Sequence, residues 1–385
     1  MTRVEVSPVI LKWAANRAGK SESIHLDFPQ WVQWINNERK LTFKQLEELS
    51  KKTSTPLGYF FLKEPPVERL PIPHFRTIDN PNRVGPSPNL LETVQTMERR
   101  QAWMREYLIE NENDPLPFVA KGKAVPHPIE IANDMRQELG LKNDWAAGFR
   151  TWQDALRLLF QKIEDAGILV VVNSIVGNNS HRKLDVNEFR GFVLVDNYAP
   201  LIFVNGSDGK AAQMFTLAHE LAHIWYGASA AFDLQNLQPA DNEIEWKCNL
   251  IAAEFLVPES ELRKFWASVH LEHEPFQQIA RRFKVSEIVA ARRIYDLGLI
   301  TKNKFFEFYQ KRYIVELQES QVDDHNGGGN FYATQKFRIS RRFAEAVIRA
   351  TFEGKLLYNE AYRLTGLKSE TFSKFAKYLG FEGEQ

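Results

Sequence analysis

The chain has 385 residues, of which 44% are hydrophobic and 12% aromatic, so it is not disordered and has room for two or three domains with buried cores. Lysine and arginine together number 49, as do aspartate and glutamate, so the formal net charge is zero. The whole chain therefore has no positive charge that would attract nucleic acid, although a local basic patch is not excluded. The single cysteine, Cys248, excludes an intrachain disulfide and a cysteine-rich zinc site. No apolar stretch has the length of a signal peptide or a membrane helix, so we expect a cytoplasmic protein without a membrane partner.

The N-terminal part of the chain shows helical patterns that end at a proline-rich segment. Residues 7–19 predict a short amphipathic helix with Ser7 as its cap, and Thr42 is the predicted cap of a later helix. Prolines recur through residues 64–88, which predicts a linker or a wrapping segment because proline sustains neither helix nor sheet. A long helical pattern follows at residues 89–112.

The centre of the chain alternates between helical and strand-like patterns. Residues 151–166 predict an amphipathic helix. Three strand-like runs follow, at residues 168–172, 189–195 and 201–205. Residues 197–200 predict a hairpin turn between the last two runs. The helical pattern resumes at Lys210 and fills most of the remainder, apart from the glycine-rich residues 323–330, which predict a hinge or a tight turn.

Residues 219–223 read His-Glu-Leu-Ala-His, which is the most specific chemical signal in the sequence. On a helix, His219 and His223 share one face, so both imidazoles can bind one metal ion. Glu220 would flank a metal-bound water and take its proton as the water attacks a carbonyl. The pattern also occurs by chance, but two histidines on a strongly apolar helix need partners, because buried unpaired polar groups are costly. The motif therefore favours a catalytic Zn²⁺ site.

The third protein ligand that a catalytic zinc needs is less clearly marked. Residues 242–258 predict a second helix, which offers Glu243, Glu245 and Glu254. The commoner fate of any one glutamate is a solvated surface, and the pattern alone does not separate Glu243 from Glu245. Cys248 lies one turn from Glu245, but a lone cysteine on an apolar helix face is more often a small core residue than a ligand.

Together the two helical patterns closely resemble the ImmA/IrrE family of metallopeptidases. In that family the H-E-x-x-H helix is followed by a helix of the type E-x-x-[AC]-N-x-x-A-A-x-x-L-x-P, which residues 245–258 match. The resemblance implies that Glu245, which opens this pattern, is the third zinc ligand. It also implies a regulatory protein substrate, either a helix-turn-helix repressor or an antitoxin-like protein, in stress response or in the control of mobile elements.

The N-terminal segment resembles the Cro/repressor-type helix-turn-helix module that is often fused to this peptidase, which makes DNA a further candidate partner. A DNA-reading helix carries several exposed polar and basic residues. Within residues 20–33, however, Lys20 and His25 are the only candidate cations, and Pro29 interrupts the segment. A helical module for packing or protein recognition is therefore at least as well supported.

Four other features of the sequence are less specific. Residues 276–300 predict either a helix-turn-helix or an ordinary helical hairpin. Residues 335–385 carry ten Lys and Arg against six Glu, a basic bias that suits phosphate contacts or a solvated helical surface. An edge of the predicted strand pair could accept an extended peptide. Arg190 in this pair is more simply an outward-facing charge than a substrate contact.

We therefore expect an α+β fold, mostly helical, with a small β-sheet in a zincin-like peptidase domain that helical regions flank. The expected parts are a helix-turn-helix-like module (1–75), a linker and helical segment (76–144), the zinc metallopeptidase domain (145–275), a helical segment with a candidate helix-turn-helix (276–322) and a C-terminal helical region (323–385). The expected function is Zn²⁺-dependent endopeptidase, with His219, His223 and Glu245 as ligands and Glu220 as general base. The alternative is a DNA-binding regulator or antitoxin-like module whose metal site is structural or vestigial.

Overall fold

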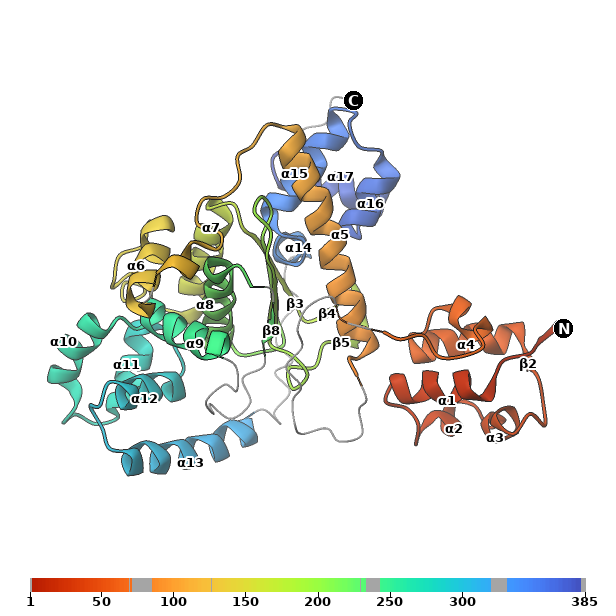
Figure 1. Cartoon of the computed structure of the whole chain (residues 1–385), viewed down its shortest axis with the longest axis horizontal. Coiled ribbons are helices and arrows are strands. Elements are labelled where there is room, and N and C mark those ends of the chain that lie inside the picture. The colour runs from red at the N-terminus through yellow and green to blue at the C-terminus, as the bar shows by residue number, and fades with distance from the viewer. Residues whose placement is uncertain are drawn as a thin grey trace.

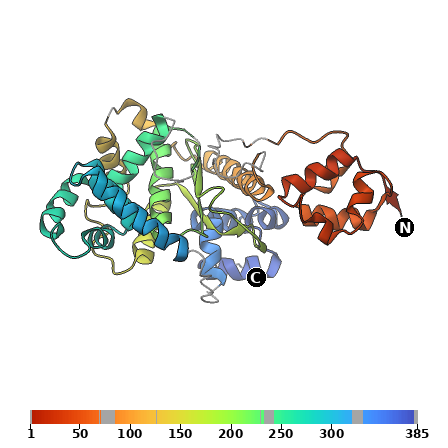
Figure 2. The ribbon, with the colours of Figure 1, turned by 90° about the horizontal axis from the view of Figure 1, so that it is seen from below.

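The computed structural model of this chain describes residues 2–68, 70, 85–125, 127–228, 230–232, 243–319 and 331–381, with the backbone alone at 230–232 and 313–319. The fold is α+β and mostly helical, as expected, with the main sheet near the centre (Figure 1). The N-terminal helices lie at one end of the molecule in both views (Figures 1 and 2). The predicted linker at 64–88 falls partly outside the described residues, and the glycine-rich segment 323–330 falls wholly outside them.

Short elements around an apolar core make up the N-terminal unit. They are β1 (Arg3–Val4), α1 (Pro8–Arg17), α2 (Ile24–Asp27), α3 (Trp31–Ile35), β2 (Leu41–Thr42), α4 (Phe43–Thr53) and the 3-10 turn η1 (Leu57–Phe61). The helices predicted at 7–19 and after Thr42 are confirmed, and Thr42 and Gln45 form a reciprocal capping box at the start of α4. Ser7 stands at the cap position of α1, but its side chain makes no capping hydrogen bond. Pro29 separates α2 from α3, so neither exceeds five residues.

The next helices lead to the sheet. They are α5 (Pro88–Glu110), η2 (Lys121–Ala124), α6 (Pro128–Glu138) and α7 (Trp152–Asp165). Both long helical predictions in this stretch are thus confirmed. The hydroxyl of Thr151 accepts the N–H of Asp154 at the start of α7, and Gly167 ends it with a φ of +101°, which favours glycine.

The main sheet has four strands in the order β3-β7-β6-β8, which are β3 (Leu169–Asn173), β7 (Leu201–Asn205), β6 (Gly191–Leu194) and β8 (Ala230–Phe232). β3 runs parallel to β7, and the other pairs are antiparallel. The three predicted strands and the hairpin turn are confirmed, because Leu194 pairs with Leu201 across the turn. β8 and the small hairpin of β4 (Ile175–Val176) and β5 (Asn179–Lys183) were not predicted. Their short sequences lack a clear two-residue alternation of polar and apolar side chains.

Apolar cores cover both faces of the sheet. Val170, Val193 and Ile202 belong to the core shared with α7 and with α8 (Lys210–Tyr226). Their neighbours Leu169 and Phe203 point the other way, into a core shared with α5, α14 (Phe331–Ile339) and α15 (Arg341–Phe352). Burial on both faces explains why these strands are continuous apolar runs. Figure 1 shows α8 on one side of the sheet and α5 and α14 on the other.

The remaining helices complete the two ends of the fold. They are α9 (Glu243–Leu256), α10 (Glu259–Val269), α11 (Pro275–Phe283), α12 (Glu287–Asp296), α13 (Lys302–Glu319), α16 (Tyr358–Thr365) and α17 (Ser369–Tyr378). Buried polar groups tie the C-terminal helices to the rest. Arg100 on α5 donates to the carbonyl oxygens of Leu364 and Arg338, and Ser340 donates to Glu164 on α7 at 2.6 Å. Burial raises the pKa of Glu164 to about 7 although Ser340 stabilises its anion.

Within the described residues, every helix is too short or too polar to cross a membrane.

Candidate metal centre

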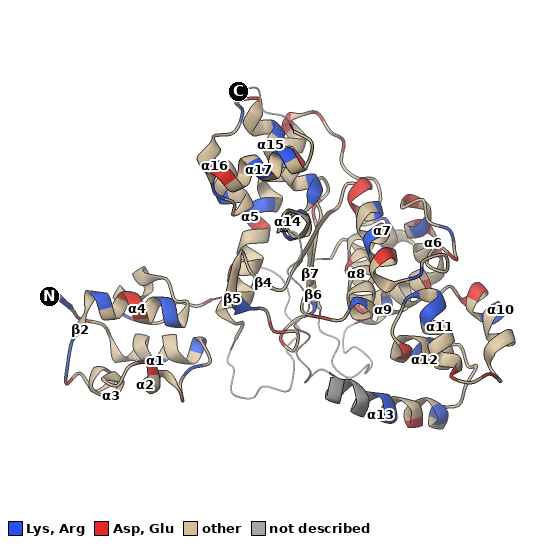
Figure 3. Ribbon diagram, turned by 180° about the vertical axis from the view of Figure 1, so that it is seen from behind, with Lys and Arg blue, Asp and Glu red and all other residues tan. Residues whose placement is uncertain are grey.

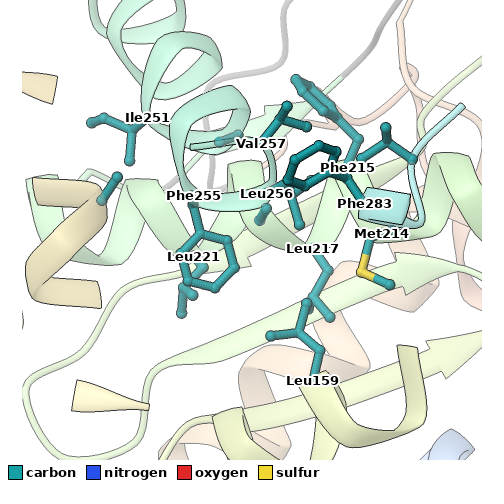
Figure 4. Close-up of a cluster of buried hydrophobic side chains, with 14 of the residues drawn as sticks. Leu159, Met214, Phe215, Leu217, Leu221, Ile251, Phe255, Leu256, Val257 and Phe283 are labelled. Carbon is teal, nitrogen blue, oxygen red and sulfur yellow. The ribbon is translucent and has the colours of Figure 1, made fainter. Parts of the chain in front are cut away.

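Helix α8 carries the H-E-x-x-H motif through the interior of the molecule. Residues 213–225 are all buried, because α8 packs on α7, on α9 and on strands β6 and β7. Figure 4 shows apolar side chains of the two helices in one cluster, among them Leu221 of α8 and Phe255 of α9. This packing fixes the two helices that carry the predicted metal ligands.

Three candidate ligands meet between α8 and α9. The Nε2 atoms of His219 and His223 lie 3.0 Å apart. Glu245 of α9 lies 3.1 Å from His219 Nε2 through one carboxylate oxygen and 3.2 Å from His223 Nε2 through the other. Both histidines are fully buried, and Glu245 is 7% exposed. Among the described residues, these three are the group whose donor atoms are placed to hold a metal ion.

The hydrogen bonds of His219 show that its inner nitrogen needs a cation. Its Nδ1 lies 3.0 Å from the side-chain oxygen of Asn249, which only accepts, so Nδ1 carries the proton. A neutral imidazole then has its lone pair on Nε2, which faces the carboxylate oxygen of Glu245 at 3.1 Å. Two lone pairs at this distance repel each other unless a proton or a metal ion lies between them.

The electrostatic environment disfavours a proton on His219 Nε2. Burial lowers the pKa of His219 to about 4, although Glu245 and Asn249 act in the opposite direction. Burial acts to raise the pKa of Glu245, but the contacts of its carboxylate with His219 and His223 outweigh burial and lower that pKa to about 2. At neutral pH the group therefore combines neutral His219 with an anionic carboxylate, and these are the protonation states that metal ligands require.

The donor atoms fit a zinc ion. Zinc bonds of about 2.0–2.1 Å at tetrahedral angles place neighbouring donors about 3.3 Å apart. The two Nε2 atoms are 3.0 Å apart, which is close to this value, and each has a different oxygen of Glu245 at 3.1 or 3.2 Å. Two imidazoles and one carboxylate are also a known ligand set of catalytic zinc, which leaves one position for water.

The carboxyl of Glu220 is buried beside the three candidate ligands. Neither of its carboxylate oxygens makes a hydrogen bond to any residue that the structure describes. Burial and, to a smaller extent, the charge of Glu245 raise its pKa well above the usual range. Leaving a buried carboxyl unsatisfied costs about 1–3 kcal/mol or more, so a structural role alone gives no reason for it. Such a group is suited to exchange protons with a water or a substrate.

Strand β6 lies directly against Glu220. A Cβ atom at Gly191 would come within 2.6 Å of the Thr216 methyl, 2.8 Å of the Phe203 carbonyl oxygen and 3.2 Å of Glu220 Oε1. Only glycine permits this approach of strand and helix. The hydroxyl of Thr216, one turn before Glu220, is also buried with no hydrogen-bond partner among the described residues. The side chains of Thr216 and Glu220 thus both lie against Gly191 of β6.

The other residues singled out in the sequence lie elsewhere. Glu243 is exposed and pairs with Lys247 at 2.6 Å. Glu254 faces away from the motif and pairs with buried arginines. Cys248 is buried in the apolar core, as expected of a packing residue. Arg190 forms an ion pair with Asp208 at 2.8 Å.

The sequence also contained two signals whose role was not predicted. Asn249 lies four residues after Glu245 and therefore on the same helix face. Gly191 interrupts an apolar strand, a pattern that often marks a close approach of the backbone.

Asn249→Leu is expected to weaken zinc binding by about 10–100-fold, because the substitution removes the group that orients His219 and fixes its tautomer. Competition with a chromophoric chelator measures this affinity. Glu243→Gln, on the exposed face of the same helix, is the control and should leave the affinity unchanged. Equal affinities for Asn249→Leu and the wild type would refute the assigned role of Asn249.

Comparison with known families adds two matches. Residues 163–295 match the model of peptidase family M78, described as the IrrE N-terminal-like domain. This stretch includes α8 and α9 with all four candidate site residues, and it supports the resemblance to the ImmA/IrrE family. Residues 339–378 match a domain of unknown function, DUF8813. A search of curated proteins found no relative of this chain.

Proposed function

We propose that this protein is a zinc-dependent endopeptidase. The observation that carries the proposal is the contact of His219 Nε2 with the Glu245 carboxylate at 3.1 Å, beside the carboxyl of Glu220, which has no hydrogen-bond partner among the described residues. The contact between His219 and Glu245 is favourable when a cation lies between them. Glu220 makes no hydrogen bond to the described residues that would explain its burial. The match of residues 163–295 to a peptidase family, whose members are typically zinc-dependent, supports the same conclusion.

In this proposal His219, His223 and Glu245 hold the zinc, and Asn249 orients His219. When bound, zinc acidifies a water molecule and polarises the carbonyl of the peptide bond. Glu220 accepts the proton of the attacking water on a carboxylate oxygen and later donates it to the leaving amine. Burial raises the pKa of Glu220, and a carboxyl with a raised pKa is better suited than an ordinary one to both proton transfers.

The substrate that we propose is a cytoplasmic regulatory protein, either a helix-turn-helix repressor or an antitoxin-like protein. This part of the proposal rests on the resemblance to the ImmA/IrrE family. A structural metal site in a DNA-binding regulator is less well supported, because it leaves the buried carboxyl of Glu220 unexplained.

Labelling of new protein N-termini tests the substrate directly. Cells that produce the wild type are compared with cells that produce Glu220→Gln, both with zinc and under the same stress. We expect a small set of new N-termini that depends on Glu220 and falls within DNA-binding regulators. New N-termini confined to other protein classes would refute the substrate, and no Glu220-dependent terminus would count against the peptidase.

A further inference from the structure

The C-terminal helices α15, α16 and α17 form a three-helix unit whose polar outer face the proposed peptidase does not explain. Their inward side chains pack into one core, which includes Phe343, Val347, Leu367, Phe372 and Phe375. The unit coincides with the match to a domain of unknown function at residues 339–378.

The turn between α16 and α17 is that of a helix-turn-helix. Three residues separate Thr365, the last of α16, from Ser369, the first of α17. Gly366 opens the turn with a φ of +72°, which favours glycine, and Leu367 is buried beneath it. Two helices joined by a three- or four-residue turn with glycine are the unit whose second helix enters the major groove of DNA.

Helix α17 presents a polar face to the outside. Phe372, Phe375 and Ala376 point into the core. The exposed residues of α17 are Ser369, Glu370, Ser373, Lys374, Lys377 and Tyr378, and the polar ones lie on the opposite side at helical spacing. Hydroxyl and ammonium groups of this kind suit contacts with base edges and phosphates.

The unit is basic although the whole chain is neutral. Residues 339–378 carry eight Lys and Arg against four Glu, a net charge of +4. Figure 3 shows basic residues on α15 and α17. On α17 itself Lys374 pairs with Glu370 at 2.6 Å. Both side chains of this ion pair are exposed, so the pair is weak and Lys374 can bind a phosphate instead of Glu370.

Two other helix pairs in the described part of the chain lack this combination. Helix α12 packs on α13, and its arginines bind within the protein, Arg292 to Asp296 and Arg293 to Glu254. In the N-terminal unit α2 and α3 have only four and five residues. Only α17 among these second helices combines length with an exposed polar face.

We propose that the α16–α17 unit binds double-stranded DNA, with α17 in the major groove. Lys368 in the turn and Lys374 and Lys377 on the helix contact phosphates, and the hydroxyl groups of Ser369 and Ser373 face the bases. This binding needs neither the zinc nor Glu220, so it is independent of the proposed peptidase.

Fluorescence anisotropy of the full-length protein with a labelled 30-base-pair duplex of mixed sequence tests the binding. We expect Lys368→Glu/Lys374→Glu/Lys377→Glu to weaken binding at least about 10-fold at low salt. The slope of log K for binding against log salt concentration should become shallower by about 0.9 for each phosphate that is no longer neutralised. The matched control, Lys44→Glu/Lys51→Glu/Lys52→Glu, reverses three charges on α4 and should have a much smaller effect. Melting curves of both variants verify that they are folded.

A selection from random duplexes then tests recognition by α17. Ser369→Ala/Ser373→Ala should change the selected sequence while leaving the affinity for mixed-sequence duplex nearly unchanged. Absence of duplex binding in the wild type would overturn the proposal. So would a loss of binding confined to the α4 variant, or tighter binding of single-stranded RNA than of duplex DNA.

Discussion

The purified Glu220→Gln protein is expected to keep its zinc and its melting temperature and to lose cleavage of its protein substrate by about 10²–10⁴-fold. The reason is that Glu220 makes no hydrogen bond to the described residues, so an amide of the same shape breaks no hydrogen bond within the protein. The three ligands are unchanged, whereas the amide can no longer take up a proton. Elemental analysis, thermal unfolding and a cleavage assay provide the three measurements.

Two outcomes would contradict this expectation in different ways. Full cleavage by Glu220→Gln would show that another group activates the water. Loss of zinc from the same variant would show that Glu220 is a ligand. Glu243→Gln is the matched control, because it makes the same chemical change at an exposed position on α9.

Glu254→Gln is expected to lower the free energy of unfolding by about 3–5 kcal/mol. Glu254 lies buried between Arg136 of α6 and Arg293 of α12, and it pairs with both. Arginine stays charged at any accessible pH, so the substitution leaves two buried cations without their counter-charge. Chemical denaturation followed by circular dichroism measures the effect.

Glu259→Gln is the control for this experiment. Glu259 forms an ion pair with Arg263 one turn away on α10, and both side chains are partly exposed. Such a pair contributes less than about 1 kcal/mol, so the control should stay close to the wild type. A Glu254→Gln protein as stable as the control would show that the buried arginines do not depend on this carboxylate.

Local patterns in the sequence predicted most of the long helices and three strands of the main sheet. The cap at Thr42, the glycine after α7 and the apolar runs of β3, β6 and β7 are signals that neighbouring residues carry. The spacing of His219 and His223 is equally local, because two residues four apart on a helix share a face. These predictions did not require knowledge of what packs against what.

Features that depend on contacts between distant segments of the chain were harder to predict from the sequence. The pattern left Glu243 and Glu245 open as ligands, and only the resemblance to a family favoured Glu245. In the structure the rotation of α9 against α8 turns Glu245 inward and leaves Glu243 in solvent. The strand β8 depends on pairing with β6 rather than on its own composition. The close approach of Gly191 to Thr216 likewise joins residues that local periodicity does not relate.

The apolar core beneath α14 and α15 has a consequence for how the protein unfolds. Phe203 and Leu169 of the sheet share this core with Phe343 and Val347. The C-terminal helices therefore cover the face of the sheet that is opposite to α8. A chain cut after residue 295, where the peptidase match ends, would expose the apolar side chains on that face of the sheet to water. The two matched regions are therefore expected to melt in one cooperative transition, and the peptidase region depends on helices that lie beyond its match.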